Sequence, residues 1–160
     1  MVSKNIFTDG KNLGIAGGII SILSVFLPWF SGSGSMGILG LSSSISVNGL
    51  GWKNGEGLLM GLFTGNANWG LFGMAVLALG IVSIVAALVL KDKLQSLVLL
   101  ECGLLVIGVG IVNLWRMGSF SGAFMGATME SGAGYGLYVV LLGGAVITAG
   151  GLLTWRDINN

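Results

Sequence analysis

Long apolar runs separated by short polar breaks dominate this chain of 160 residues. Four of these runs, at residues 13–30, 69–90, 95–115 and 135–155, approach the roughly 20 apolar residues that a hydrocarbon core about 30 Å thick requires. A segment in lipid must satisfy its own backbone hydrogen bonds, so each run is predicted to be a helix despite its glycines. The pattern therefore predicts an all-α integral membrane protein. We expect one membrane domain over residues 1–160, folded as a four-helix antiparallel bundle.

The connections between these runs are unequal in length. Residues 31–68 form a long first outer loop, residues 116–134 form a second outer loop, and residues 91–94 form a tight inner turn. In the second outer loop, apolar side chains recur at roughly helical spacing, which predicts a short amphipathic helix there. These side chains are Phe120, Phe124, Met125 and Met129.

Three short patterns subdivide the first outer loop. Residues 31–35 alternate serine with glycine, a composition typical of a flexible stretch. Residues 44–48 alternate polar with apolar side chains, which predicts one strand of a small exposed sheet. Residues 57–63 are apolar but too few to cross a bilayer, so we expect them to lie in the interface or to pack back on the bundle.

Small residues recur every seven positions within the four runs. Such a repeat stays on one helix face when helices cross at about +20°. In membranes, small residues on that face allow two backbones to approach closely. We therefore expect a tightly packed bundle, with room for a further small-residue face against a neighbouring subunit. The positions assigned to helix packing are Gly14, Gly18, Gly73, Gly80, Gly103, Gly110, Gly136, Gly143 and Gly150.

Basic and aromatic residues near the ends of the runs predict the orientation. Placing both termini in the cytoplasm puts five of the seven Lys and Arg residues inside, with Lys53 and Arg116 outside. Aromatic side chains gather where this topology places the membrane boundaries, and we expect them to anchor the helices among lipid headgroups. These anchors are Trp29, Trp69, Trp115 and Tyr135 at the outer boundary and Trp155 at the inner one. The protein is predicted to be a multi-pass protein of the cell membrane.

Composition narrows the chemistry further. The chain is 54% hydrophobic and 8% charged, with 30 glycines and a net charge of +1. This balance excludes an ordinary water-soluble enzyme and a nucleic-acid-binding protein. The chain contains no histidine and one cysteine, so an internal disulfide and the usual Cys/His metal sites are not expected. No catalytic residues and no cofactor are predicted.

Glu101 is the one acidic residue inside a predicted span. Acids at such depth usually face the bundle interior and have a partner or a task. Glu101 is therefore a candidate ion or proton site. The alternative is a structural role, either as a neutral acid or in a salt bridge to Lys11, Lys91 or Lys93, and the closeness of these lysines favours that alternative.

Two stretches resemble a known group of proteins. Phe26-Leu27-Pro28-Trp29 closes the first run, and Gly134-Tyr135-Gly136-Leu137-Tyr138 followed by Gly143-Gly144 opens the fourth. Both are similar to segments of small four-span prokaryotic membrane proteins of unknown function, and the resemblance implies a topology alone. The long first outer loop, the expected strand and Trp52 also resemble the claudin-like tetraspan layout, although the paired cysteines of the claudin loop have no counterpart here.

These observations favour a non-enzymatic membrane protein that acts by association. It would be an accessory subunit of a larger membrane complex or a self-assembling component of a membrane or envelope. Its expected partners are the lipid bilayer and other membrane subunits or copies of itself, with no nucleic acid. The alternative is an oligomeric channel or small transporter with Glu101 in its pathway.

Overall fold

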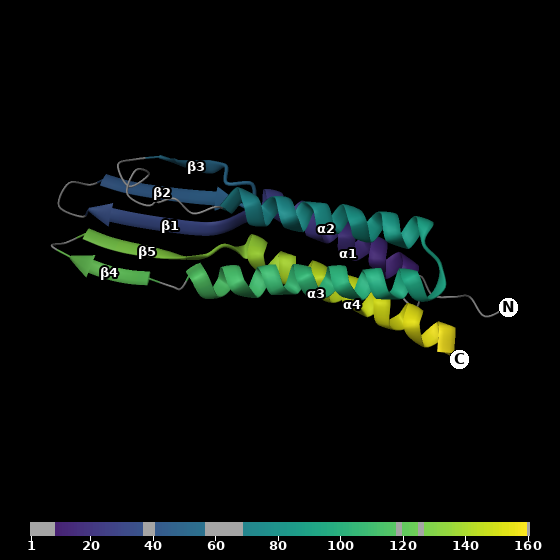
Figure 1. Ribbon diagram of the computed structural model, residues 1–160. Helices are drawn as coiled ribbons and strands as arrows, with labels where there is room; N and C mark the ends of the chain where they lie inside the picture. The colour runs from purple at the N-terminus through teal and green to yellow at the C-terminus, as the bar shows by residue number, and fades with distance from the viewer. Residues whose placement is uncertain (1–8, 37–40, 57–68, 118–119, 125–126, 160) are drawn as a thin grey trace.

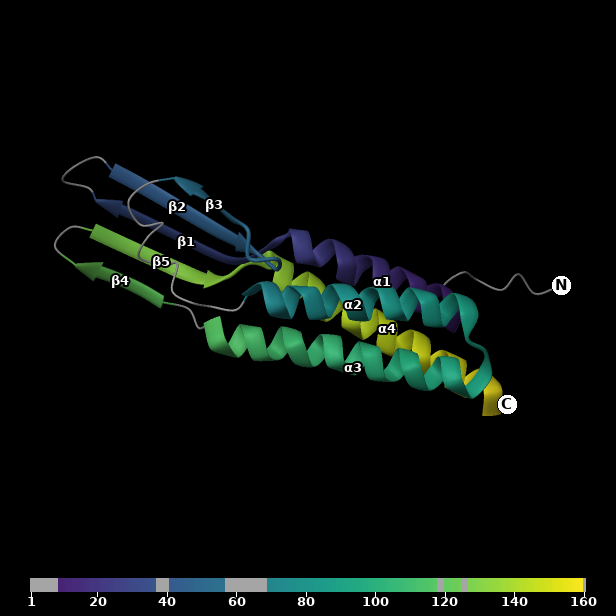
Figure 2. The ribbon, with the colours of Figure 1, turned by 45° about the horizontal axis from the view of Figure 1, so that its top comes forward.

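The computed structural model describes residues 9–36, 41–56, 69–117, 120–124 and 127–159. Four helices lie along one another, and a five-stranded antiparallel sheet extends from one end of them, giving an elongated molecule (Figure 1). Helix α1 begins and helix α4 ends at the opposite end of the bundle from the sheet. A second view, rotated by 45°, shows the same end-to-end arrangement (Figure 2).

The helices follow the four apolar runs with shifted ends. They are α1 (Gly10–Phe26), α2 (Trp69–Val89), α3 (Asp92–Met117) and α4 (Tyr135–Asn159). Helices α2, α3 and α4 are long and apolar enough to cross a membrane, whereas α1 is apolar but has 17 residues. Helix α1 begins after Asp9, whose side chain accepts a hydrogen bond from the Lys11 amide at 3.1 Å. It ends well before residue 30, because the residue before a proline is disfavoured in helical geometry and Pro28 follows Leu27.

Reciprocal glycine contacts hold the helices together. Helix α1 packs against both α2 and α4, and α3 packs against α4. At three crossings, a Cβ atom added to either glycine of a pair would lie only 2.8–3.2 Å from the partner's carbonyl oxygen. The pairs are Gly18 with Gly80, Gly17 with Gly143, and Gly103 with Gly144. The backbones therefore approach too closely for any side chain, which is the physical reason for glycine at these positions.

The two outer connections together build the sheet. Its strands are β1 (Pro28–Met36), β2 (Leu41–Asn48), β3 (Lys53–Glu56), β4 (Phe120–Phe124) and β5 (Ala127–Ala133). Their spatial order is β3-β2-β1-β5-β4, and every pair is antiparallel. The first outer connection supplies β1, β2 and β3, and the second supplies β4 and β5. The prediction of an all-α protein with one small strand element is therefore correct for the helices but understates the sheet.

Two expectations for the outer connections are wrong. Residues 31–35 are not a flexible stretch but part of β1, the central strand, which pairs with β2 on one side and β5 on the other. The second connection forms the β4–β5 hairpin, not an amphipathic helix. The few apolar side chains of the second connection fit both a helical and a strand period. In both segments, hydrogen bonding to neighbouring strands determines the conformation. The expected strand at residues 44–48 is confirmed within β2.

The central strands continue directly from helices. Only Leu27 separates α1 from β1, and only Gly134 separates β5 from α4. Trp29 lies at this junction and is fully buried (0% exposed). Its indole Nε1 donates a hydrogen bond to the Ser24 carbonyl at 2.9 Å, and its own carbonyl accepts one from the Gly134 amide at 2.7 Å. The position of Trp29 near the end of an apolar run predicts a headgroup anchor, and this prediction is wrong. Trp29 is instead buried at the centre of the junction between helices and sheet.

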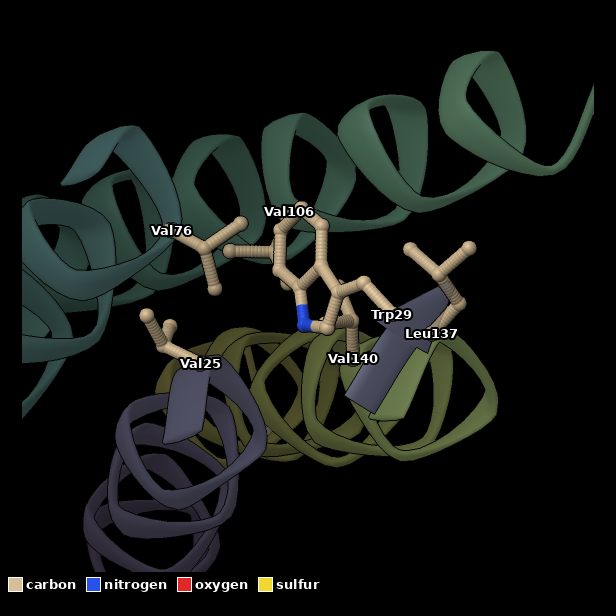
Figure 3. Close-up of a cluster of buried hydrophobic side chains, with 6 residues drawn as sticks. All are labelled: Val25, Trp29, Val76, Val106, Leu137 and Val140. Atoms are coloured by element: carbon tan, nitrogen blue, oxygen red, sulfur yellow. The ribbon is translucent and has the colours of Figure 1, made fainter. Parts of the chain in front are cut away.

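Side chains from every helix surround this tryptophan. Figure 3 shows Val25 of α1, Val76 of α2, Val106 of α3, and Leu137 and Val140 of α4 gathered around Trp29 of β1. A second buried cluster, with Leu99 and Ile147, lies farther along the bundle. The end of the sheet therefore packs into the core of the bundle, and no flexible linker separates β1 or β5 from its helix.

Candidate functional site

One face of the five-stranded sheet carries a regular array of hydroxyl groups. In β2, Ile45 and Val47 are buried, so the alternating side chains of Ser44 and Ser46 turn to the other face. In β1, serines alternate with glycines, and residues directly opposite in an antiparallel pair share a face. Across β2, β1 and β5 the register therefore forms three rows: Ser46–Ser31–Gly132, Ser44–Ser33–Glu130 and Ser42–Ser35–Thr128.

We call the side chains of this array the hydroxyl face. It consists of Ser31, Ser33, Ser35, Ser42, Ser44, Ser46, Thr128 and Glu130, and all are exposed except the half-buried Ser46. Neighbouring strands lie about 4.8 Å apart, and residues on one face of a strand recur about every 6.8 Å. These two spacings arrange the hydrogen-bonding groups as a two-dimensional grid. The helix bundle keeps this grid in one orientation.

The hydroxyl face is hollowed by two adjoining depressions. One, of about 460 Å³, lies over the row of Ser42, Ser35 and Thr128. The other, of about 510 Å³, lies over the row of Ser46 and Ser31 and reaches Asn54. Both are also lined by the middle row of Ser44, Ser33 and Glu130. The two depressions thus form one shallow trough along whose middle runs the row of Ser44, Ser33 and Glu130.

The trough has the chemistry of a polar recognition surface. The Ser35 and Thr128 hydroxyls form a hydrogen bond at 2.8 Å, and the Ser46 hydroxyl donates to the Asn54 carbonyl at 3.4 Å. A hydroxyl can donate and accept, whereas an ionised carboxylate only accepts. Within the residues that the structure describes, no three His, Cys, Asp or Glu side chains gather as metal ligands would. The arrangement can therefore bind a polar partner through many hydrogen bonds spread over a broad area.

Sequence reasoning did not identify the hydroxyl face, although its signal is present. Serine occupies positions 31, 33 and 35, and again positions 42, 44 and 46, where Ser43 is a further serine of the other register. Alternation of this kind places one residue type on one face of a strand. The first of these stretches also has the composition of a flexible linker, and only its pairing on both edges shows that it is a strand.

Glu101 does not point into the bundle. It lies on the exposed face of α3, while its neighbours Cys102 and Gly103 are buried against the other helices. Among the described residues, the one ion pair within 4.0 Å joins Arg156 to Asp157, so no lysine bridges Glu101. A pathway lined by Glu101 would therefore have to run outside the bundle of a single copy.

The nine glycines assigned to helix packing divide into two groups. Gly14, Gly18, Gly80, Gly103, Gly110, Gly143 and Gly150 each lie against another helix. Gly73 and Gly136 instead contact the junction between bundle and sheet. A Cβ atom at Gly73 would meet the Gly49 carbonyl, and one at Gly136 would lie 2.7 Å from the Pro28 carbonyl oxygen.

The other expected anchors lie near the helix ends. Trp115 and Tyr135 are exposed at the end that carries the sheet, and Trp155 is exposed near the opposite end. Trp69 is the first residue of α2. The Arg116 guanidinium lies over the Phe72 ring, 5.3 Å from its centroid, which joins α3 to α2 near the sheet. The apolar stretch 57–63 lies outside the described residues.

Comparisons with known proteins add no family to these observations. No protein-family model matches the chain, and no curated protein matches it either. The function of the chain therefore has to be inferred from its own residues.

Proposed function

We propose that this chain is a non-enzymatic integral membrane protein that acts by association. Its four helices cross the bilayer with both termini in the cytoplasm, and the hydroxyl face is its contact surface outside. It serves as a self-assembling membrane or envelope component or as an accessory subunit of a larger membrane complex. The observation that carries this proposal is the direct continuation of α1 into β1 and of β5 into α4.

A rigid connection suits a contact surface. Binding costs free energy wherever it must order loops or side chains, and a surface that is already ordered avoids much of that cost. The paired central strands and the buried Trp29 hold the hydroxyl face at one orientation to the helices. Short serine side chains also lose less rotamer freedom than long ones. A surface of this kind favours a partner that docks repeatedly in one orientation.

The sides of the bundle support the proposed topology. Lys11, Lys91, Lys93 and Arg156 lie near the end opposite the sheet, where a cytoplasmic face attracts positive charge. Helix α1 is about 25 Å long by its helical rise and runs beside α2 and α4 through glycine contacts. We therefore infer that α1 crosses the same layer as its longer neighbours.

The oligomeric state of the purified full-length protein tests the proposal. Native mass spectrometry from mild detergent and from lipid nanodiscs should show particles heavier than the 16.4 kDa chain, as multiples of that mass or with a defined second polypeptide. A strictly monomeric particle with no co-purifying partner in both media would contradict the proposal.

A pair of substitutions tests the hydroxyl face itself. Ser33→Arg places a large cation in the middle row and should shift the assembly toward smaller particles. Trp52→Arg changes an exposed residue in the turn before β3, outside the hydroxyl face, and should leave the mass distribution unchanged. Equal effects of the two substitutions would remove the hydroxyl face from the contact.

A further inference from the structure

The outward face of α3 has two features that the bundle itself does not use. A continuous line of exposed positions runs along this helix with alternating spacings of three and four residues. We call it the α3 seam. It consists of Leu94, Leu97, Glu101, Leu104, Gly108, Ile111 and Trp115. This spacing is that of a helix face that packs on another helix in a left-handed pair.

The first feature is the Glu101 carboxyl group. Its Cα lies eight residues from Lys93, or about 12 Å along the helix, and the seam around it is leucine. A carboxyl group on a lipid-facing surface at this depth is costly without a hydrogen-bonding partner. Because the described part of the same chain supplies no ion-pair partner, a group from outside the chain would have to supply the contact.

The second feature is the open space at Gly108. At every other glycine within the four helices, an added Cβ atom would have a neighbouring atom within 4 Å, and at most of them this neighbour belongs to another helix. At Gly108 there is nothing within 4 Å. Gly108 lies about two helical turns, or about 10 Å, along the seam from Glu101. At most glycines of the four helices the backbone of another segment comes within 4 Å of the added Cβ atom, whereas the surface at Gly108 is open.

We propose that the α3 seam binds the α3 seam of a second copy of this chain. This inference rests on the proposed function, of which it specifies one interface. All copies insert into the membrane in one orientation, so two α3 helices related by a two-fold axis along the membrane normal run parallel. Residues of equal depth then meet, and Gly108 meets Gly108 at the closest approach.

The same symmetry brings the two Glu101 side chains together. A protonated carboxyl group can donate a hydrogen bond to an oxygen of a second carboxyl group, so two Glu101 side chains can pair without a residue of another protein. A single polar position in an otherwise apolar seam also determines register and partner number, as it does in coiled coils. The seam is thus complementary to itself in shape and in hydrogen bonding.

Cysteine crosslinking of the full-length protein in lipid vesicles tests this interface. In a Cys102→Ala background, Leu104→Cys places a thiol on the seam and Leu142→Cys places one on α4. The two leucines are matched, since they are 60% and 57% exposed. Brief treatment with a short bismaleimide should crosslink Leu104→Cys into a dimer at least about tenfold faster than Leu142→Cys, because only the seam positions are held together.

Second substitutions in the Leu104→Cys protein separate the two features. Gly108→Leu fills the open space and should lower the dimer association constant about tenfold. Glu101→Leu removes the hydrogen bond and should lower it about threefold, whereas Glu101→Gln can still pair with itself and should retain most of the association. Circular dichroism should show unchanged helix content, because both positions are exposed.

The outcomes distinguish this interface from association in general. Equal crosslinking at the two leucines, together with native masses above the monomer, would overturn the seam and leave the proposed function standing. If Leu104→Cys crosslinks solely to a different polypeptide, the seam binds that protein and the proposal of a second copy is wrong. A monomer in every medium would overturn both the seam and the proposed function.

Discussion

Removal of the Trp29 side chain should detach the sheet from the bundle and destabilise both. A fully buried tryptophan covers about 150–250 Å² of surface, worth about 4–6 kcal/mol at 25 cal/mol per Å². Tryptophan-to-alanine changes in cores cost about 3–5 kcal/mol. We therefore expect Trp29→Ala to lower the free energy of unfolding by about 4 kcal/mol, or the melting temperature by about 10 °C for a chain of this size.

A graded substitution separates packing from hydrogen bonding. Trp29→Phe keeps an aromatic ring but removes the Nε1 donor to the Ser24 carbonyl. That carbonyl still accepts the Leu27 amide, so it does not become unsatisfied. The cost should be about 2 kcal/mol, from the lost hydrogen bond and the smaller ring. The order of stability should be wild type, then Trp29→Phe, then Trp29→Ala.

Cys102 provides the assay. It is the one cysteine of the chain and is 5% exposed, so a thiol-reactive fluorophore labels it only as the bundle opens. Melting curves recorded with this dye in mild detergent give the temperature shifts. Hydrogen exchange of the Gly49 and Gly134 amides, which donate to the Val25 and Trp29 carbonyls, reports on the junction directly.

The exposed Trp52 is the control for Trp29. Trp52→Ala should change the melting temperature by no more than about 1 °C, because the side chain is 62% exposed. If Trp29→Ala melts as Trp52→Ala does and leaves the two glycine amides equally protected, the junction is not what joins the sheet to the bundle.

Three further predictions use similar measurements. Gly103→Ala should lower the free energy of unfolding by about 2 kcal/mol because its methyl group meets α4. In the dissociated monomer, Gly108→Ala should raise it by up to about 1 kcal/mol through helix propensity, since nothing lies within 4 Å of the added Cβ atom. Equal shifts of the two variants in dye-monitored melting of the monomer would refute the packing role of Gly103. Asn48→Ala removes the Oδ1 acceptor of two backbone amides and should cost about 1–2 kcal/mol, and a melt no lower than that of an exposed asparagine variant of β3 would count against it. With Cys102 replaced, an impermeant maleimide added to intact cells should label Trp52→Cys and spare Lys91→Cys; labelling of both from one side would overturn the topology.

The helices could be predicted closely from local pattern. Apolar runs near 20 residues predict helices because each backbone amide in lipid needs a partner within its own segment. The seven-residue spacing of Gly103 and Gly110, and that of Gly143 and Gly150, also indicates close helix packing before any partner is known. The ends are less certain from pattern alone, since Pro28 ends α1 while the apolar run continues to Phe30.

The hydropathy pattern of an apolar helix does not predict which of its side chains face the other helices. Glu101 was expected to face the bundle interior, yet Cys102 and Gly103 face it instead. Adjacent positions differ by about 100° around the helix, and in an apolar helix both faces have similar composition. Only the contact of Gly103 with Gly144 shows which face is turned inward.

The sequence by itself predicted the four helices and the glycine register along them, because these depend on local composition and on backbone hydrogen bonding within each segment. The tertiary structure alone decided that residues 31–35 form the central strand of a sheet, that Trp29 lies in a core and not at a headgroup, and that Glu101 and Gly108 share an outward face. Each of these depends on partners distant in the chain: β5 for the strand, all four helices for the tryptophan, and α4 for the rotation of α3. Serine and glycine have little strand preference of their own, so their conformation follows from the backbone hydrogen bonds that neighbouring strands offer.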